Sequence, residues 1–250
     1  MKDKINYIKY TIILILSKEL ITNYVMTAII PELKLIFVSI PKCACTSLKN
    51  CMFFLENKYE YKPIKNNGKI LDIHRLYPSM YFDKLKKKLE NTSYDISDYT
   101  KICLIRDPIK RFVSAYTNRV NHHKELSKKV IEENDLDPSM ANPTFIKFVK
   151  HYYLYKNVRS IKHHTDHMYK FIGDNPSYFD KVFNINNINE ISDFLKKQYG
   201  IEYKIPRLQT GGGGSESIDL EDIKEKRPNI YKRIEQITSQ DYKIFSQYLK

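Results

Sequence analysis

The sequence predicts an α/β fold in which a parallel sheet is flanked by helices. Three short apolar segments, rich in β-branched and aromatic residues, have the length of buried strands, and each is followed by a turn and a segment with helical spacing. This alternation is typical of a parallel sheet with helices on both faces. The strand–helix pairs are 34–40 with 46–55, 101–105 with a helix that starts at Pro108, and 181–185 with 188–199.

The turn after the first strand has the residue types of an anion-binding site. The run is Pro41, Lys42, Cys43, Ala44, Cys45, Thr46 and Ser47. The free N–H groups and the dipole of the following helix point toward this turn, the lysine adds positive charge, and the hydroxyl groups add donors. The run is not a Walker A loop, because it lacks glycine and its lysine precedes the threonine by four residues. The alternative is an ordinary strand–helix junction with a surface lysine.

The second strand is followed by another set of anion-binding groups. Arg106 stands at its end, Asp107 has the character of an N-cap, and Pro108 suits the first position of a helix. Ser114 then falls about two turns into that helix. Two such strand ends on one sheet predict a site that grips both ends of a doubly phosphorylated nucleotide.

Together the two segments, P-K-x-x-x-T-S and R-D-P-x-x-R-x-x-S-A-Y, resemble the two cofactor signatures of the sulfotransferases. They are most similar to the carbohydrate sulfotransferases of the chondroitin/HNK-1 type (sulfotransferase family 2) and their bacterial relatives, and weaker similarity covers roughly residues 34 to 250. The resemblance implies a P-loop-like, sulfotransferase-type sheet and 3′-phosphoadenosine 5′-phosphosulfate (PAPS) as sulfuryl donor, with no metal required. It implies that residues 41–47, chiefly Lys42, Thr46 and Ser47, bind the 5′-phosphosulfate, and that Arg106 and Ser114 bind the 3′-phosphate. It also favours a hydroxyl of a glycan as the acceptor.

Sulfuryl transfer to a hydroxyl requires a base, and His74 is the candidate. A neutral histidine accepts a proton near pH 7, and His74 follows a strand-like run from Ile70 that we expect to end at the same sheet edge. Lys42 is the candidate for stabilising charge on the leaving phosphate. The competing interpretation of His74 is a structural or surface histidine.

A second group of histidines lies at 163–167. His164 and His167 are candidate acceptor contacts or alternative bases, and the other interpretation is that they are surface residues. On one continuous helix His163 and His167 would share a face, but the sequence offers no third metal ligand beside them.

The charge of the chain favours anionic partners. Lysine and arginine number 42 against 29 acidic residues, a net charge of +13, which suits nucleotide cofactors and acidic glycans. A lysine-rich composition that merely solvates the surface is the alternative. No nucleic-acid-binding motif is present, so nucleic acid is not expected as a partner. The four cysteines lie on or beside the cofactor strands and lack zinc-finger spacing, which predicts reduced thiols.

The N-terminal segment 1–30 is predicted to be helical, with residues 31–250 as a single domain. Its strongest apolar run, 11–16, is too short to span a bilayer, so we expect no transmembrane anchor, although peripheral membrane contact is compatible with it. The absence of a clear signal-peptide cleavage site favours a cytoplasmic location.

The remaining segments are predicted more coarsely. Helices are expected at 80–90, 145–155 and 229–249, and a polar loop or lid at 121–143. The segment Gly211–Gly214 has three interpretations: a phosphate-binding loop, a surface loop or an engineered linker. Arg207 is interpreted either as a contact to the 3′-phosphate or as a surface arginine.

Two other classes of function compete with sulfuryl transfer. A nucleotide-dependent phosphotransferase would use the same strand–turn–helix cradle, but the Walker glycines and an acidic magnesium ligand after a strand are missing. A non-enzymatic protein that binds nucleic acid or anionic glycan would use the charge and the 32 tyrosine and phenylalanine residues, most of which have core-like spacing.

Overall fold

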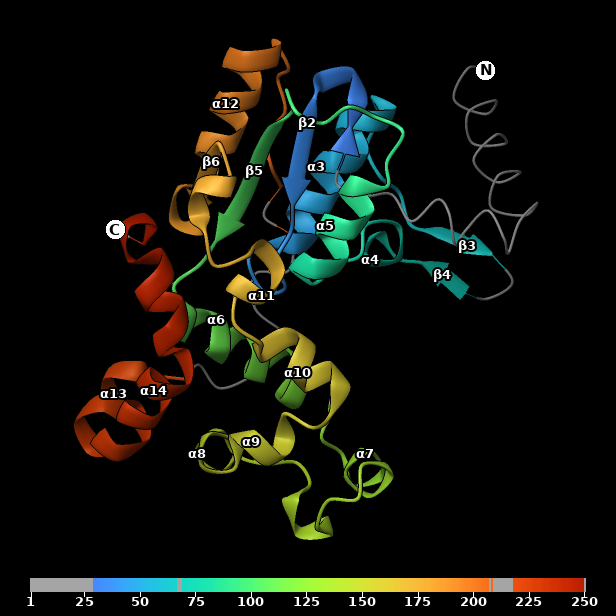
Figure 1. Cartoon of the computed structure of the whole chain (residues 1–250). Helices are drawn as coiled ribbons and strands as arrows, with labels where there is room; N and C mark the ends of the chain where they lie inside the picture. Colours follow the sequence, from blue (N-terminus) through green and yellow to red (C-terminus); the bar gives the residue numbers. More distant parts are fainter. Residues whose placement is uncertain (1–28, 67–68, 207, 209–217, 250) are drawn as a thin grey trace.

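The main sheet has four strands in the order β1-β2-β5-β6 (Figure 1). This computed structural model describes residues 29–66, 69–206, 208 and 218–249. The strands are β1 (Ile29–Ile30), β2 (Leu35–Val38), β5 (Thr100–Ile105) and β6 (Lys181–Asn184). β5 pairs in parallel with both β2 and β6, which confirms the predicted parallel sheet. β1, which the sequence pattern did not predict, is antiparallel to β2 because only the short turn η1 (Pro31–Leu33) connects them.

Helices cover both faces of this sheet, because side chains alternate along each strand. One set of strand side chains faces α3 (Cys45–Asn57) and α12 (Asn189–Tyr199); it comprises Leu35, Phe37, Ile102, Leu104 and Phe183. The alternate set faces α5 (Phe82–Glu90) and α11 (Tyr169–Ile172); it comprises Ile36, Val38, Cys103 and Ile105. The four cysteines are free thiols, as the sequence predicted, and three of them are buried.

A layer of helices lies beyond the carboxyl ends of the parallel strands, where the arrowheads of β2 and β5 point in Figure 1. Its helices are α6 (Pro108–Ala115), α7 (Lys128–Glu133), α8 (Phe145–Lys150), α9 (Tyr152–Tyr155), α10 (Arg159–Thr165), α13 (Leu220–Lys226) and α14 (Pro228–Phe245). The π-helical segment η2 (Tyr116–His122) continues α6. These elements share one apolar cluster with Phe112, Phe148 and Ile234 inside it. The predicted helices at 145–155 and 229–249 are confirmed, the first with a break at His151.

The prediction of a loop over 121–143 was wrong in part. The segment contains α7 and the turn η3 (Pro138–Met140), and the side chains of Leu126 and Ile131 are fully buried. Its apolar face consists of so few residues that the surrounding polar positions obscured the helical spacing.

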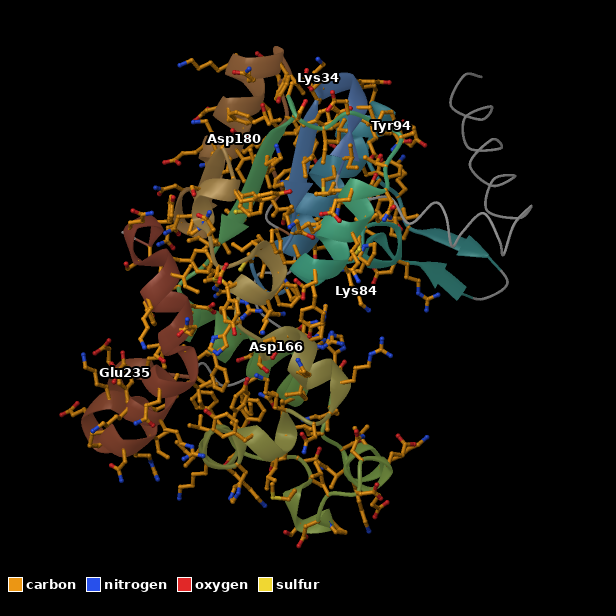
Figure 2. All side chains as sticks on the ribbon, viewed as in Figure 1. Lys34, Lys84, Tyr94, Asp166, Asp180 and Glu235 are labelled. Carbon is orange, nitrogen blue, oxygen red and sulfur yellow. The ribbon has the colours of Figure 1, made fainter. Side chains whose placement is uncertain are left out.

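Asp166 joins the two layers, and Figure 2 shows it between them. Its carboxylate accepts a hydrogen bond of 2.8 Å from the Tyr81 hydroxyl and forms ion pairs with Lys156 and Lys162.

Other short turns complete the described part of the chain: η4 (Pro176–Tyr178), η5 (Ile185–Asn187) and η6 (Ser246–Tyr248).

The segment before His74 does not belong to the main sheet, contrary to the prediction. β3 (Ile64–Asn66) and β4 (Lys69–Leu71) form a separate antiparallel pair, and α4 (Ile73–Leu76) follows. Asp72 is the reason for the change, because its carboxylate accepts a hydrogen bond of 2.9 Å from the N–H of His74 and caps the new helix.

Within the described residues, no helix has the length and apolarity needed to cross a membrane. The predicted helical segment lies almost wholly outside this part of the chain, as do Arg207 and Gly211–Gly214.

Two glycines that end helices allow a test of the packing of α11 against α5. Gly173 ends α11 with φ 78° and ψ 171°, and a Cβ there would lie 2.9 Å from the Phe82 ring of α5. Gly200 ends α12 with φ 67° and has open space around a Cβ. We expect Gly200→Ala to lower the free energy of unfolding by about 1 kcal/mol through backbone strain alone. We expect Gly173→Ala to lower it by about 3 kcal/mol, because strain and the clash with Phe82 add. Urea denaturation of both variants measures this, and equal losses would contradict the proposed contact.

Candidate functional site

The turn between β2 and α3 adopts a left-handed backbone without glycine. Lys42 has φ 68° and Ala44 has φ 48°, and the N–H of Cys43 donates a 3.2 Å hydrogen bond to the carbonyl of Ile40. Each such residue costs on the order of 1 kcal/mol. Ala44 is the N-cap of α3 and offers no side-chain acceptor, so the helix begins without a side-chain cap. Strain and uncapped N–H groups at one turn are typical of an anion-binding site.

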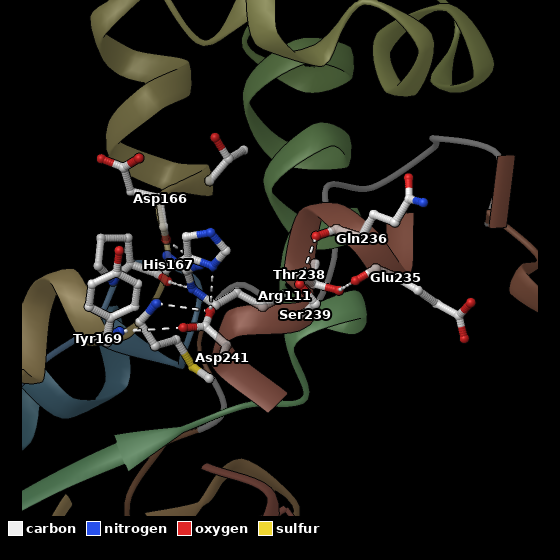
Figure 3. Close-up of polar contacts among 12 residues, drawn as sticks. Arg111, Asp166, His167, Tyr169, Glu235, Gln236, Thr238, Ser239 and Asp241 are labelled. Carbon is white, nitrogen blue, oxygen red and sulfur yellow. Dashed lines mark hydrogen bonds and ion pairs between the residues drawn. The ribbon is translucent and has the colours of Figure 1, made fainter. Parts of the chain in front are cut away.

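Two arginines of the second motif bind the carbonyl groups of this turn. Arg106 donates to the carbonyl of Lys42 at 3.2 Å, and Arg111 donates through Nε to the carbonyl of Pro41 at 2.9 Å. Arg111 is only 2% exposed and also donates through Nη1 to the carbonyl of Asp166 at 2.7 Å, the contact region drawn in Figure 3. Arg111 therefore connects the turn with the end of α10, a role that the sequence interpretation missed.

Asp107 caps α6 as predicted. One carboxylate oxygen accepts from the N–H of Lys110 at 2.8 Å, and the other accepts from the hydroxyl of Tyr242 on α14 at 2.6 Å. These two bonds hold the second motif in place between the sheet and α14.

A cleft of about 610 Å³ opens where the two motifs meet. Its polar wall contains Lys42, Ala44, Cys45, Thr46, Ser47, Arg106, Lys110 and Ser114, and its other wall contains Ile185, Asn186, Ile188, Pro206, Leu208, Ile218 and Leu220. The structure thus brings together seven of the predicted cofactor residues. Pro41 and Cys43 do not line the cleft: both are buried beneath the turn, and burial raises the pKa of the Cys43 thiol to about 12.

Lys42 reaches into the site from the strained turn. Its ammonium group donates a 2.7 Å hydrogen bond to Oδ1 of Asn118, which the π-helical segment η2 presents. Burial, together with the charges of Arg119, Arg106 and Arg111, lowers the pKa of Lys42 to about 8. Asn118 was not predicted, since only the tertiary fold brings η2 to this turn.

His74 lies against α3 rather than at a strand end. Its Nε2 is 3.0 Å from Oγ1 of Thr46, and its Nδ1 is 2.9 Å from Nζ of Lys49. Burial, and then the charge of Lys49, lower the pKa of His74 to about 4, so the ring is neutral at pH 7. His74 is therefore adjacent to the cradle through Thr46, although the strand before it, β4, belongs to the separate β3–β4 pair and not to the main sheet.

The histidines at 163–167 separate into two environments, because α10 ends at Thr165. His164 bonds to the carbonyl of Ser160 at 2.7 Å, and burial, with the charges of Arg119, His163 and Lys42, lowers its pKa to about 3. His167 instead lies 3.7 Å from the carboxylate of Asp241 on α14 and stacks on Tyr169 (Figure 3). The shared helical face expected for His163 and His167 is not formed.

Comparison with known proteins agrees with this arrangement. A sequence model of the sulfotransferase family matches residues 26–248. The chain belongs to the sulfotransferase family. Human carbohydrate sulfotransferase 9 is 25% identical over 139 residues, which are 48% of this chain and 28% of the human protein. The chain thus matches little more than a quarter of that relative's length, and no solved structure matches it significantly.

The positive charges of the site are not balanced by acidic side chains in ion pairs. Within the described ranges, the ion pairs include none of Lys42, Lys49, Arg106 or Arg111. Burying cations without acidic partners costs stability, and an anionic ligand in the cleft would offset that cost.

Lys42→Met tests the cost of this charge in the unliganded sulfotransferase. Folding lowers the pKa of Lys42 from 10.5 to about 8, so its charged form destabilises the folded state below pH 8 and this penalty fades as the pH rises toward 10.5. We expect Lys42→Met to raise the free energy of unfolding at about pH 7 by up to about 3 kcal/mol, and by less at about pH 9.5.

Chemical denaturation at the two pH values makes the measurement. Lys86→Met is the control, because Lys86 is exposed on α5 and forms a surface pair with Glu90. If Lys42→Met is less stable than the wild type, or if the stability difference between the two does not depend on pH, then the charge of Lys42 does not destabilise the folded protein.

Proposed function

We propose that this sulfotransferase transfers a sulfuryl group from PAPS to a hydroxyl group of a carbohydrate. The observation that carries the proposal is the single cleft in which both motifs place cationic and hydroxyl side chains. Family membership supports sulfuryl transfer, and the similarity to a carbohydrate sulfotransferase supports a sugar acceptor. The net charge of +13 is compatible with an acidic glycan.

The residues of the cleft fit a donor with two separate anionic groups. Lys42, Thr46 and Ser47 come from the end of β2 and the start of α3, whereas Arg106 and Ser114 come from β5 and α6. The apolar wall with Ile188 and Leu208 offers a surface for a flat base between these polar ends. PAPS would supply the activated sulfuryl group and a phosphate leaving group.

The side chains have different tasks toward that donor. Lys42 would contribute positive charge at the 5′ end, and Thr46 and Ser47 would donate hydrogen bonds there. Arg106 and Ser114 would bind the 3′-phosphate. Because Arg106 also bonds to the carbonyl of Lys42, binding at the 3′ end would stabilise the backbone that presents the 5′ end.

His74 would accept the proton of the attacking hydroxyl at Nε2. This atom lies 3.0 Å from Oγ1 of Thr46, a residue of the cleft wall, and the low pKa of His74 leaves the ring unprotonated at neutral pH. His164, which bonds to the carbonyl of Ser160, would contact the acceptor.

Calorimetric titration with 3′-phosphoadenosine 5′-phosphate, ADP and Mg-ATP tests the donor. We expect the 3′-phosphorylated nucleotide alone to bind at about micromolar affinity. Ser114→Ala should weaken binding about tenfold through the loss of one hydrogen bond to an anion, and Lys42→Ala and Arg106→Ala should abolish it, whereas Lys86→Ala leaves it unchanged. Preference for Mg-ATP would indicate a phosphotransferase. Salt-sensitive binding of DNA without nucleotide binding would indicate a non-enzymatic basic protein.

The His74→Ala variant tests the role of His74 as base independently of donor binding. We expect normal affinity for 3′-phosphoadenosine 5′-phosphate but a loss of turnover of about 10²–10⁴-fold, because only proton transfer is removed. Transfer of radioactive sulfate from labelled PAPS to a panel of glycans measures the rate. Full activity would exclude His74, and the same measurement on His164→Ala would then examine the alternative base.

A further inference from the structure

Helix α3 holds both ring nitrogens of His74. Oγ1 of Thr46 lies 3.0 Å from Nε2, and Nζ of Lys49 lies 2.9 Å from Nδ1. The two α3 residues are three positions apart and therefore face the same side of the helix. This arrangement determines the orientation of the imidazole, and it also constrains which nitrogen carries the proton.

Lys49 is a buried lysine with a histidine as its partner. It is 1% exposed, and its hydrogen bond among the described residues is the one to Nδ1 of His74. The carboxylate whose charge acts on Lys49, that of Asp72, accepts a bond from the N–H of His74. Burial lowers the pKa of Lys49 from its usual value, which makes the neutral amine accessible.

The charged form of Lys49 requires one tautomer of His74, whereas the neutral form permits the other. A charged ammonium group only donates, so Nδ1 must accept and a neutral ring carries its proton on Nε2, directed at Thr46. In that state Nε2 has no lone pair available for a proton. A neutral amine has a lone pair as well as N–H donors, so it can accept from Nδ1–H, and Nε2 then keeps its lone pair, which faces Oγ1 of Thr46.

We propose that Lys49 is a positioning residue that sets the tautomer of His74, and that its neutral amine produces the form in which Nε2 can act as base. The inference rests on the proposed role of His74. In the step, the acceptor oxygen would form its bond to sulfur while the bond from sulfur to the oxygen of the nucleotide phosphate breaks, and the acceptor proton would move to Nε2. The resulting imidazolium keeps its Nδ1–H bonded to the amine of Lys49.

Other charged groups surround the pair from each adjacent element. They are Lys42 and Cys45 in the turn and at the start of α3, Asp72 before α4, Arg119 on η2 and His163 on α10. The charges of Lys42 and Arg119 oppose protonation of His74, whereas Asp72 favours it. Of these groups, Lys49 is the one that bonds directly to Nδ1.

Nitrogen NMR of the imidazole side chains measures the tautomer without any need for activity. The His74→Gln variant identifies the signals of His74 among the seven histidines. As the pH is raised and Lys49 loses its proton, we expect the proton of the wild-type ring to move from Nε2 to Nδ1. Lys49→Arg stays charged and should place the proton on Nε2. Lys49→Met should do the same, because Thr46 is then the remaining polar partner.

Lys49→Met provides a second variant in case the bulkier Lys49→Arg misfolds. Methionine is unbranched, and it replaces a buried charge with an apolar group. Both variants should lose turnover by about 10²–10⁴-fold, as His74→Ala does, while binding 3′-phosphoadenosine 5′-phosphate normally. The wild-type rate relative to that of Lys49→Arg should rise with pH as Lys49 loses its proton, because Lys42, whose pKa is about 8, titrates in both proteins and cancels in the comparison. Lys86→Met should keep both the wild-type tautomer and the wild-type rate.

The NMR result alone decides the inference. A wild-type ring that keeps its proton on Nε2 up to about pH 10.5, the usual pKa of a lysine, or a variant ring with its proton on Nδ1, overturns it. If the tautomers change as expected but His74→Ala keeps full activity, Lys49 does set the tautomer and it is the base assignment that fails.

Discussion

The contacts of Arg106 and Arg111 with the carbonyl groups of Lys42 and Pro41 hold the turn after β2 in its left-handed conformation. Without glycine, this conformation is unfavourable for the chain alone, so neighbouring groups must stabilise it. The same two arginines follow β5, the strand that pairs with β2, and the parallel register of the two strands places their carboxyl ends side by side. The site therefore depends on sheet pairing and on these two side chains together.

The turn is also the place where the layers of the protein meet. Arg111 extends from α6 to the end of α10, while Asp107 bonds to Tyr242 of α14. Asp241 on the same helix accepts from the N–H of Met168, just after α10 (Figure 3). Movement of the helical layer would thus disturb the cradle, because these hydrogen bonds connect the two directly.

Unpaired positive charge gives the site its chemical character. Lys42, Lys49, Arg106 and Arg111 are buried or half-buried, and the carboxylates nearby are engaged in capping or in other ion pairs. Burial lowers the pKa of both lysines, which brings their titration closer to physiological pH than that of an exposed lysine. A site of this kind stabilises an anion strongly and sacrifices stability of the empty protein.

The sequence by itself determined the local elements and the family. Apolar runs predicted β2, β5 and β6, and the order Asp107-Pro108 predicted the start of α6, because strand burial and helix capping depend on neighbouring residues. The two motifs predicted the cradle residues that line the cleft. Only the tertiary structure decided the partners: Asn118 for Lys42, Lys49 for His74, and Arg111 for the turn. It also placed the strand before His74 in a separate antiparallel pair, with Asp72 capping α4, and it ended α10 before His167. These contacts join residues that the chain alone does not bring together, so no local pattern of residues encodes them.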